Sequence, residues 1–142
     1  MSSDFVEAID LGSNSFHMIV ARIANGHVQI LDRLREMVQL AAGLDSHHRL
    51  SAESQQRALD CLARFGQRLR HIPPARLRIV GTNTLRQARN SAEFVARAEQ
   101  LLGHRVEIVS GQEEARLIYL GVAHSVGDVA GQRLVVDIGG GS

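Results

Sequence analysis

One short pattern occurs twice in this chain, once near each end, and it constrains the fold more than any other feature. The first copy is Ile9-Asp10-Leu11-Gly12-Ser13-Asn14-Ser15, and the second is Val136-Asp137-Ile138-Gly139-Gly140-Gly141-Ser142. Each copy follows an apolar run, Phe5 to Ile9 or Leu134 to Val136, that predicts a buried strand. Each copy therefore places an aspartate at a strand end, followed by a glycine loop whose backbone N–H groups can approach a ligand closely.

Loops of this kind suit phosphate, because phosphate oxygens accept hydrogen bonds from several converging N–H and hydroxyl donors. The paired aspartates Asp10 and Asp137 suit Mg²⁺, which binds through one or two carboxylates, water and substrate phosphates. The alternative is two unrelated strand-to-turn transitions, since Asp, Gly and Ser are common turn residues. The shared register of the two copies favours phosphate binding.

Composition narrows the class of protein. The 142 residues suffice for one domain with its own core, and 44% hydrophobic with 22% charged residues is typical of a soluble globular protein. A net charge of +1 gives no general affinity for nucleic acid. The lone Cys61 excludes a disulfide framework and fits a reducing cytoplasm. No long apolar span is present, so we expect no membrane-spanning segment.

The first half of the chain predicts an antiparallel start to a sheet. Asn25-Gly26 between two apolar runs is a strong hairpin signal, because both turn residues need positive φ. The Gly12 loop is then the first turn of a three-stranded arrangement. Ser51 is the expected N-cap of a helix that reaches about Arg70, with a buried stripe at Ala58, Leu62, Phe65 and Leu69.

The second half alternates strands with helices. The strands are expected at residues 77–81, 106–109 and 133–137, and the helices at about 84–102 and 110–123. Thr84 with Gln87, and Ser110 with Glu113, have capping-box spacing. The alternation predicts a parallel extension of the sheet, with helices covering it.

Two charged residues in the second half, Glu114 and Arg86, are further candidates for chemistry. Glu114 shares a helix face with Leu117 and Ile118, and partial desolvation there would make it a better base; the alternative is a first-turn acid that complements the helix dipole. Glu113 is assigned to the Ser110 cap. Arg86, in the first turn of its expected helix, opposes the dipole, which indicates a nearby bound anion.

The chain resembles the exopolyphosphatase and guanosine pentaphosphate phosphohydrolase family, from about Val6 to Ser142. The matching motifs are Ile9 to His17, Gly81-Thr82 with Thr84-Leu85-Arg86, Ser110-Gly111 with Glu113-Glu114-Ala115-Arg116, and Asp137 to Ser142. The resemblance implies an α/β fold of the actin, Hsp70 and sugar-kinase superfamily. Residues 1–142 would form its N-terminal ribonuclease-H-like lobe, with a mixed five-stranded sheet, as part of a longer two-lobe protein.

The resemblance also implies site roles. Glu114 would be the catalytic residue that activates water, and Asp10 and Asp137 would lie near Mg²⁺. The implied phosphate-binding residues are Gly12, Ser13, Asn14, Ser15, Arg86, Gly139, Gly140, Gly141 and Ser142. The implied reaction is release of orthophosphate from inorganic polyphosphate, with guanosine pentaphosphate as the alternative substrate. A kinase or ATPase of the same superfamily, or a non-catalytic sensor of phosphorylated ligands, are further alternatives. We expect a cytoplasmic homodimer at full length, and an inactive lobe when it is isolated.

Overall fold

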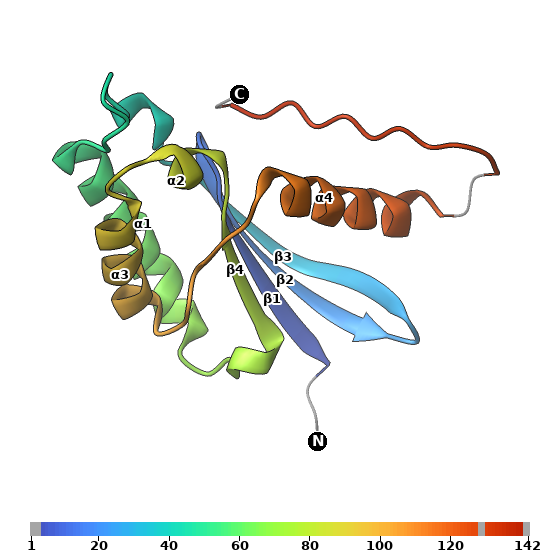
Figure 1. Cartoon of the computed structure of the whole chain (residues 1–142). Helices are drawn as coiled ribbons and strands as arrows, with labels where there is room; N and C mark the ends of the chain where they lie inside the picture. The colour runs from blue at the N-terminus through green and yellow to red at the C-terminus, as the bar shows by residue number, and fades with distance from the viewer. Residues whose placement is uncertain (1–3, 128–129, 141–142) are drawn as a thin grey trace.

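A computed structural model describes residues 4–127 and 130–140 of the protein (Figure 1). It contains one sheet with helices on both of its faces. The strands are β1 (Phe5–Leu11), β2 (Ser15–Ala24), β3 (His27–Met37), β4 (Leu77–Gly81) and β5 (Glu107–Ile108). The helices are α1 (Ala52–Leu69), α2 (Asn83–Gln87), α3 (Ser91–Leu102) and α4 (Gly111–Val126), with short 3-10 turns at Ala41–Gly43 and Pro74–Arg76.

The five strands are arranged in the order β3-β2-β1-β4-β5. The pairs β1–β2 and β2–β3 are antiparallel, whereas β1–β4 and β4–β5 are parallel. The β2–β3 hairpin turns at Asn25 and Gly26, whose φ angles are 52° and 75°. The predicted mixed five-stranded sheet, with an antiparallel start and a parallel extension, is therefore confirmed.

The core lies between the sheet and the pair of helices α1 and α3, which cover one face (Figure 1). Ser51 caps α1 by accepting a hydrogen bond from the Ser54 N–H, as its sequence predicts. The predicted stripe of Ala58, Leu62, Phe65 and Leu69 is buried. Arginines on another face of α1 reach β3, where Arg64 pairs with Glu36 and Arg68 with Asp32. This face of the sheet is thus closed by apolar packing and by ion pairs at its edge.

The helix predicted from Thr84 to Leu102 is wrong, because the chain leaves helical geometry between Gln87 and Ser91. At this break the Arg89 N–H donates to the His48 carbonyl oxygen over 2.7 Å. The Asn90 side chain bonds both the N–H and the carbonyl oxygen of Leu50. These contacts with a loop 40 residues away replace the helical hydrogen bonds, so two helices form where the local pattern predicts one.

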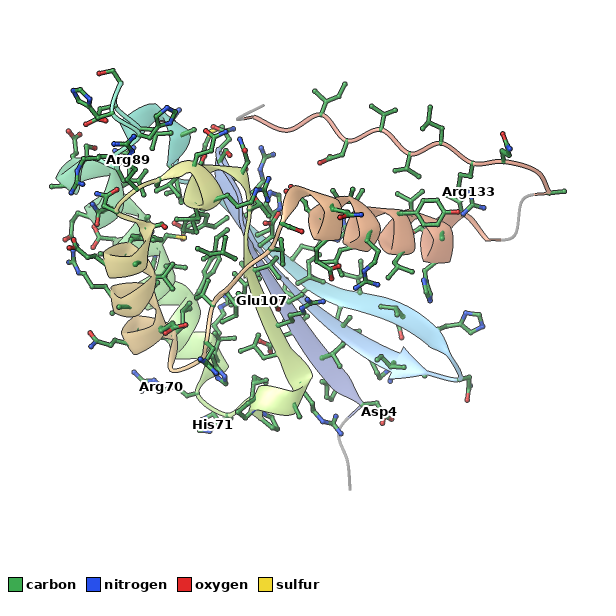
Figure 2. All side chains as sticks on the ribbon, viewed as in Figure 1. Asp4, Arg70, His71, Arg89, Glu107 and Arg133 are labelled. Carbon is green, nitrogen blue, oxygen red and sulfur yellow. The ribbon has the colours of Figure 1, made fainter. Side chains whose placement is uncertain are left out.

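The strand predicted at residues 133–137 is also absent from the described residues. From Arg133, labelled in Figure 2, the chain continues instead as a drawn-out trace without a partner among the described strands. The segment runs back along α4 rather than beside a strand (Figure 1). Leu134 and Val136 are 86% and 72% exposed, so they are not buried as the sequence predicts. Apolar alternation produces a strand only where a neighbouring strand offers N–H and C=O partners, and none of the described strands lies beside this segment. No helix within the described residues is long and apolar enough to cross a membrane.

Candidate active site

The loop between β1 and β2 is held in shape by its own carbonyl groups. The Asn14 carbonyl oxygen accepts from the N–H groups of Val38 and Gln39, and that of Ser13 accepts from Ala41. A Cβ atom on Gly12 would lie 2.9 Å from the Ser15 carbonyl oxygen, so the loop closes this tightly only with glycine at that position. The predicted phosphate loop is therefore a rigid turn whose side chains face a pocket.

Arg86 lies at the end of α2, next to this loop. The helix is only five residues long and Arg86 is in its last turn, so the predicted opposition to a helix dipole is wrong. The Thr84–Gln87 capping box is wrong as well, because Thr82 is the N-cap and the Thr84 hydroxyl binds Ser13 instead. The Arg86 Nη1 donates to the Val109 carbonyl oxygen over 2.9 Å and to Glu114 Oε2 over 2.8 Å.

The two adjacent glutamates at the start of α4 have different partners. Ser110 caps the helix by accepting from the Glu113 N–H, as predicted. The other half of the predicted capping box is wrong, because the Glu113 carboxylate does not bond the Ser110 N–H. It binds Arg116 at 2.7 Å and lies 3.7 Å from Arg78 on β4. Glu114 points to the other side, toward Arg86, and both side chains of that pair are 26% exposed. The expected partial burial of Glu114 is present, together with a cationic partner that the sequence does not reveal.

The second glycine loop reaches the first one. A Cβ on Gly140 would lie 2.9 Å from the Asn14 Cβ, so only a glycine approaches the first loop this closely without displacing it. Gly139, Gly140 and Asp137 line the same pocket as Gly12 to Ser15. The predicted positions Gly141 and Ser142 lie outside the described residues.

The pocket has a volume of about 740 Å³ and opens between the sheet, α4 and the 133–140 segment. Solvent reaches Asp10 through the open mouth, but the surrounding protein removes part of its hydration. This loss, with the nearby negative charges of Glu114 and Asp137, raises the pKa of Asp10 to about 6. Three carboxylates thus converge on one pocket, with Arg86 as the cation bonded to one of them.

The pocket offers two carboxylates, those of Asp10 and Asp137, to a divalent cation. Among residues 4–127 and 130–140, no group of three or more His, Cys, Asp or Glu side chains is arranged to hold a metal ion. Asp10 and Asp137 are nevertheless close enough for their charges to interact. Two carboxylates supplemented by water and substrate phosphate are a usual environment for Mg²⁺. Asp10 and Asp137 are accordingly the residues that would hold the ion.

Several pocket residues were not assigned a role from the sequence. His17 on β2 is paired in register with Asp10, and Tyr119 on α4 also lines the pocket. The pKa of His17 is lowered by partial burial and by the charge of Arg35. Side chains alternate between the two faces of β2, so the sequence could have predicted that His17 lies on the same face as Ser15. The position of Tyr119 could not be predicted in this way, because it depends on how α4 crosses the sheet.

Comparison with known proteins identifies the family. A family model described as the Ppx/GppA phosphatase family matches residues 19–142. The chain belongs to this family. The resemblance inferred from the glycine loops and the Glu113-Glu114 pair is thereby confirmed.

Curated and solved relatives agree with this result. Two Vibrio cholerae serotype O1 proteins, named guanosine-5'-triphosphate,3'-diphosphate pyrophosphatase, are 55% identical over all 142 residues. The chain spans 28% of their length. A crystal structure of the Aquifex aeolicus Ppx/GppA family member has a TM-score of 0.79 and 26% identity, covering 88% of this chain and 41% of that one. A Cytophaga hutchinsonii exopolyphosphatase has a TM-score of 0.76 and 29% identity, covering 83% of this chain and 38% of that one.

Proposed function

We propose that this chain supplies the phosphate-binding loops and the general base of a hydrolase that removes the terminal phosphate of guanosine pentaphosphate. The observation that carries the proposal is the meeting of the Gly12–Ser15 loop, Arg86 and Glu114 in one pocket. The 55% identity to relatives named for this nucleotide favours it over polyphosphate as the main substrate. This choice reverses the order of substrates expected from the sequence.

In the proposed reaction a water molecule attacks the terminal phosphorus, and Glu114 accepts the proton that this water loses. A new bond forms between the water oxygen and the terminal phosphorus, while the bond from that phosphorus to the bridging oxygen breaks. The bridging oxygen keeps the electron pair and remains on guanosine tetraphosphate, and both products, orthophosphate and guanosine tetraphosphate, leave the site. Phosphoryl transfer depends mainly on positioning and on stabilisation of charge, so loop N–H groups, hydroxyls and a guanidinium are suitable machinery.

From the Arg86–Glu114 ion pair we infer an order for these events. Arg86 Nη1 donates to Glu114 and to the Val109 carbonyl oxygen. An entering phosphate competes with Glu114 for the guanidinium, because charge-assisted bonds from arginine to phosphate are among the strongest available. When the phosphate has bound, Glu114 has lost its bond to Arg86 and its carboxylate can accept a proton from the water.

Asp10 and Asp137 would hold Mg²⁺, and their convergent negative charge supports this assignment. When bound, the ion supplies positive charge that offsets the phosphates. We further propose that the protein acts in the cytoplasm as a homodimer, which sedimentation of the natural-length protein would test.

Inorganic polyphosphate is the second candidate substrate, supported by the solved relative named as an exopolyphosphatase. A kinase or ATPase with the same loops would instead use ATP as a good substrate, and a sensor would bind phosphorylated ligands without releasing phosphate.

Phosphate release by the natural-length protein from guanosine pentaphosphate, polyphosphate and ATP, with Mg²⁺ or with a chelator, tests the proposal. We expect the highest kcat/KM with guanosine pentaphosphate, a lower value with polyphosphate, little turnover of ATP, and loss of activity with the chelator. ATP as the best substrate, or no release from any of the three, would contradict the proposal.

A further inference from the structure

Two buried hydroxyl groups join the first glycine loop to α2. The Thr84 Oγ1 donates to the Ser13 Oγ over 2.7 Å, between residues that are 71 positions apart in the chain. Thr84 is 2% exposed and Ser13 is 8% exposed. Buried hydroxyl groups are costly unless they are bonded, so this contact has a defined geometry and is not an incidental surface bond.

The contact determines what the Ser13 hydroxyl can do. A serine hydroxyl has one proton to donate and two lone pairs that accept. Since Ser13 Oγ accepts the proton of Thr84, its own proton remains available to another acceptor. The Ser13 carbonyl oxygen is separately held by the Ala41 N–H at 2.9 Å, and Ser13 lines the pocket. Its hydroxyl is therefore set to donate to a ligand oxygen.

Two backbone hydrogen bonds around Thr84 also connect the end of β1 with α2. The Thr82 N–H donates to the Leu11 carbonyl oxygen over 3.4 Å, and the Arg86 N–H donates to the Thr82 carbonyl oxygen over 3.0 Å. Thr84 lies between Thr82 and Arg86 in the chain, two residues from each. Helix α2, which contains Thr84 and Arg86, is located at the ends of β1 and β4 (Figure 1). The loop donors and Arg86 are consequently positioned as one unit.

We propose that Thr84 is a positioning residue that holds the Ser13 hydroxyl as a hydrogen-bond donor to the substrate's terminal phosphate and keeps this donor in register with Arg86. This inference rests on the proposed function, because it assigns a role within the same phosphate site. Thr84 itself touches no substrate; it acts through Ser13.

The test is calorimetric titration of the natural-length protein with inorganic phosphate and with guanosine pentaphosphate. A hydrogen bond to a charged group contributes enough for Ser13→Ala to weaken binding about tenfold or more. Thr84→Val, which keeps the shape but removes the hydroxyl, should weaken it by about three- to tenfold. Because both changes act on one bond, the double variant should match Ser13→Ala, and Thr84→Ser should restore binding to within about twofold.

Ser54→Ala is the matched control. Ser54 is also buried, at 1% exposed, and its hydroxyl donates to the Leu40 carbonyl oxygen at a place that does not line the pocket. This variant should lower the melting temperature and leave phosphate affinity unchanged. If Thr84→Val does not fold, Thr84→Ala removes the same hydroxyl with less steric demand, and the same coupled loss is expected.

The inference is overturned if Thr84→Val loses thermal stability as Ser54→Ala does but keeps wild-type affinity, or if the losses of Ser13→Ala and Thr84→Val add. Because calorimetry needs no turnover, the two proposals fail separately. Coupled affinity losses in a protein that releases no phosphate would leave this inference standing and contradict the hydrolase. Normal turnover of the wild type, together with wild-type phosphate affinity in Thr84→Val, would support the hydrolase and contradict this inference.

Discussion

Arg86 Nη1 lies 2.8 Å from Glu114 Oε2, so the cation proposed to bind phosphate and the proposed base are each other's partners in the structure described here. The two residues are 28 positions apart and come from different helices. A substitution of either Arg86 or Glu114 therefore removes the partner of the other residue.

Arg86→Ala should weaken substrate binding by about tenfold or more, because a charge-assisted bond to phosphate is lost. The unfolding free energy should fall by roughly 1 kcal/mol, since Glu114 and the Val109 carbonyl oxygen lose a half-buried partner. Titration calorimetry and thermal melting measure the two effects. A stabilised variant would contradict this account and would restore the explanation based on the helix dipole.

The raised pKa of Asp10 predicts a pH dependence of stability. The folded-state pKa is about 6 against 3.8 for the free side chain, so between these values the native state binds more protons than the unfolded state. The contribution to stability is present below about pH 4 and is lost as the pH rises through 6.

Asp10→Asn should remove the loss of stability that occurs when Asp10 ionises. The unfolding free energy of the variant should therefore exceed that of the wild type above pH 6. We expect a difference on the order of 1 kcal/mol, after discounting for the screening that solvent provides at an exposed carboxylate. Thermal melting of the wild type and of Asp10→Asn from pH 4 to 8, with a chelator present, measures this difference. A variant that is less stable than the wild type at pH 8 would show that Asp10 makes a favourable contact instead.

Gly66 on α1 is predicted to be intolerant of a side chain. A Cβ there would lie 2.3 Å from the Leu101 carbonyl oxygen, because α1 and α3 approach closely at this point. Gly66→Ala should lower the unfolding free energy by about 1–3 kcal/mol through overpacking.

Gly121→Ala is the helical control for this substitution, since a Cβ at Gly121 meets no atom within 4 Å. It should be neutral or stabilising by up to about 1 kcal/mol, from helix propensity. Denaturant unfolding of both variants is the measurement. Equal effects of the two substitutions would show that the close approach of α1 and α3 is not rigid.

Local sequence signals predict the parts of this fold that depend on near neighbours. The turn at Asn25 and Gly26, the buried stripe of α1, and the Ser110 cap each need only a few adjacent residues, and each is confirmed. Long-range contacts account for what the sequence did not predict. The helix break at Asn90 needs Leu50, and the partner of Glu114 needs the position of α2.

The candidate site follows the same division. The repeated glycine loops predict which residues bind phosphate, and the structure brings the described ones into one pocket. Sequence spacing alone does not show that Thr84 bonds Ser13, because this contact depends on how β4 aligns with β1. The apolar segment at 133–137 is the opposite case, in which a strong local strand signal has no described partner strand.

Glu113→Gln should change activity little, although Gln cannot keep the ion pairs with Arg116 and Arg78. These pairs are at the surface, and the Ser110 cap uses the backbone N–H of Glu113, which the substitution retains. The expected result is a small fall in melting temperature with turnover near that of the wild type. Loss of turnover would place Glu113 in the reaction.

Glu114→Gln tests the central claim most directly, with phosphate release from guanosine pentaphosphate measured beside substrate affinity in the natural-length protein. Removal of a positioned base should lower turnover by roughly 10²–10⁴ while the variant still folds. Affinity should be retained or rise, because the glycine loops and Arg86 are unchanged and the phosphate no longer competes with a carboxylate for the Arg86 guanidinium. If Glu114→Gln keeps wild-type turnover while Glu113→Gln abolishes it, the base is the neighbouring glutamate and the proposed role of Glu114 is wrong.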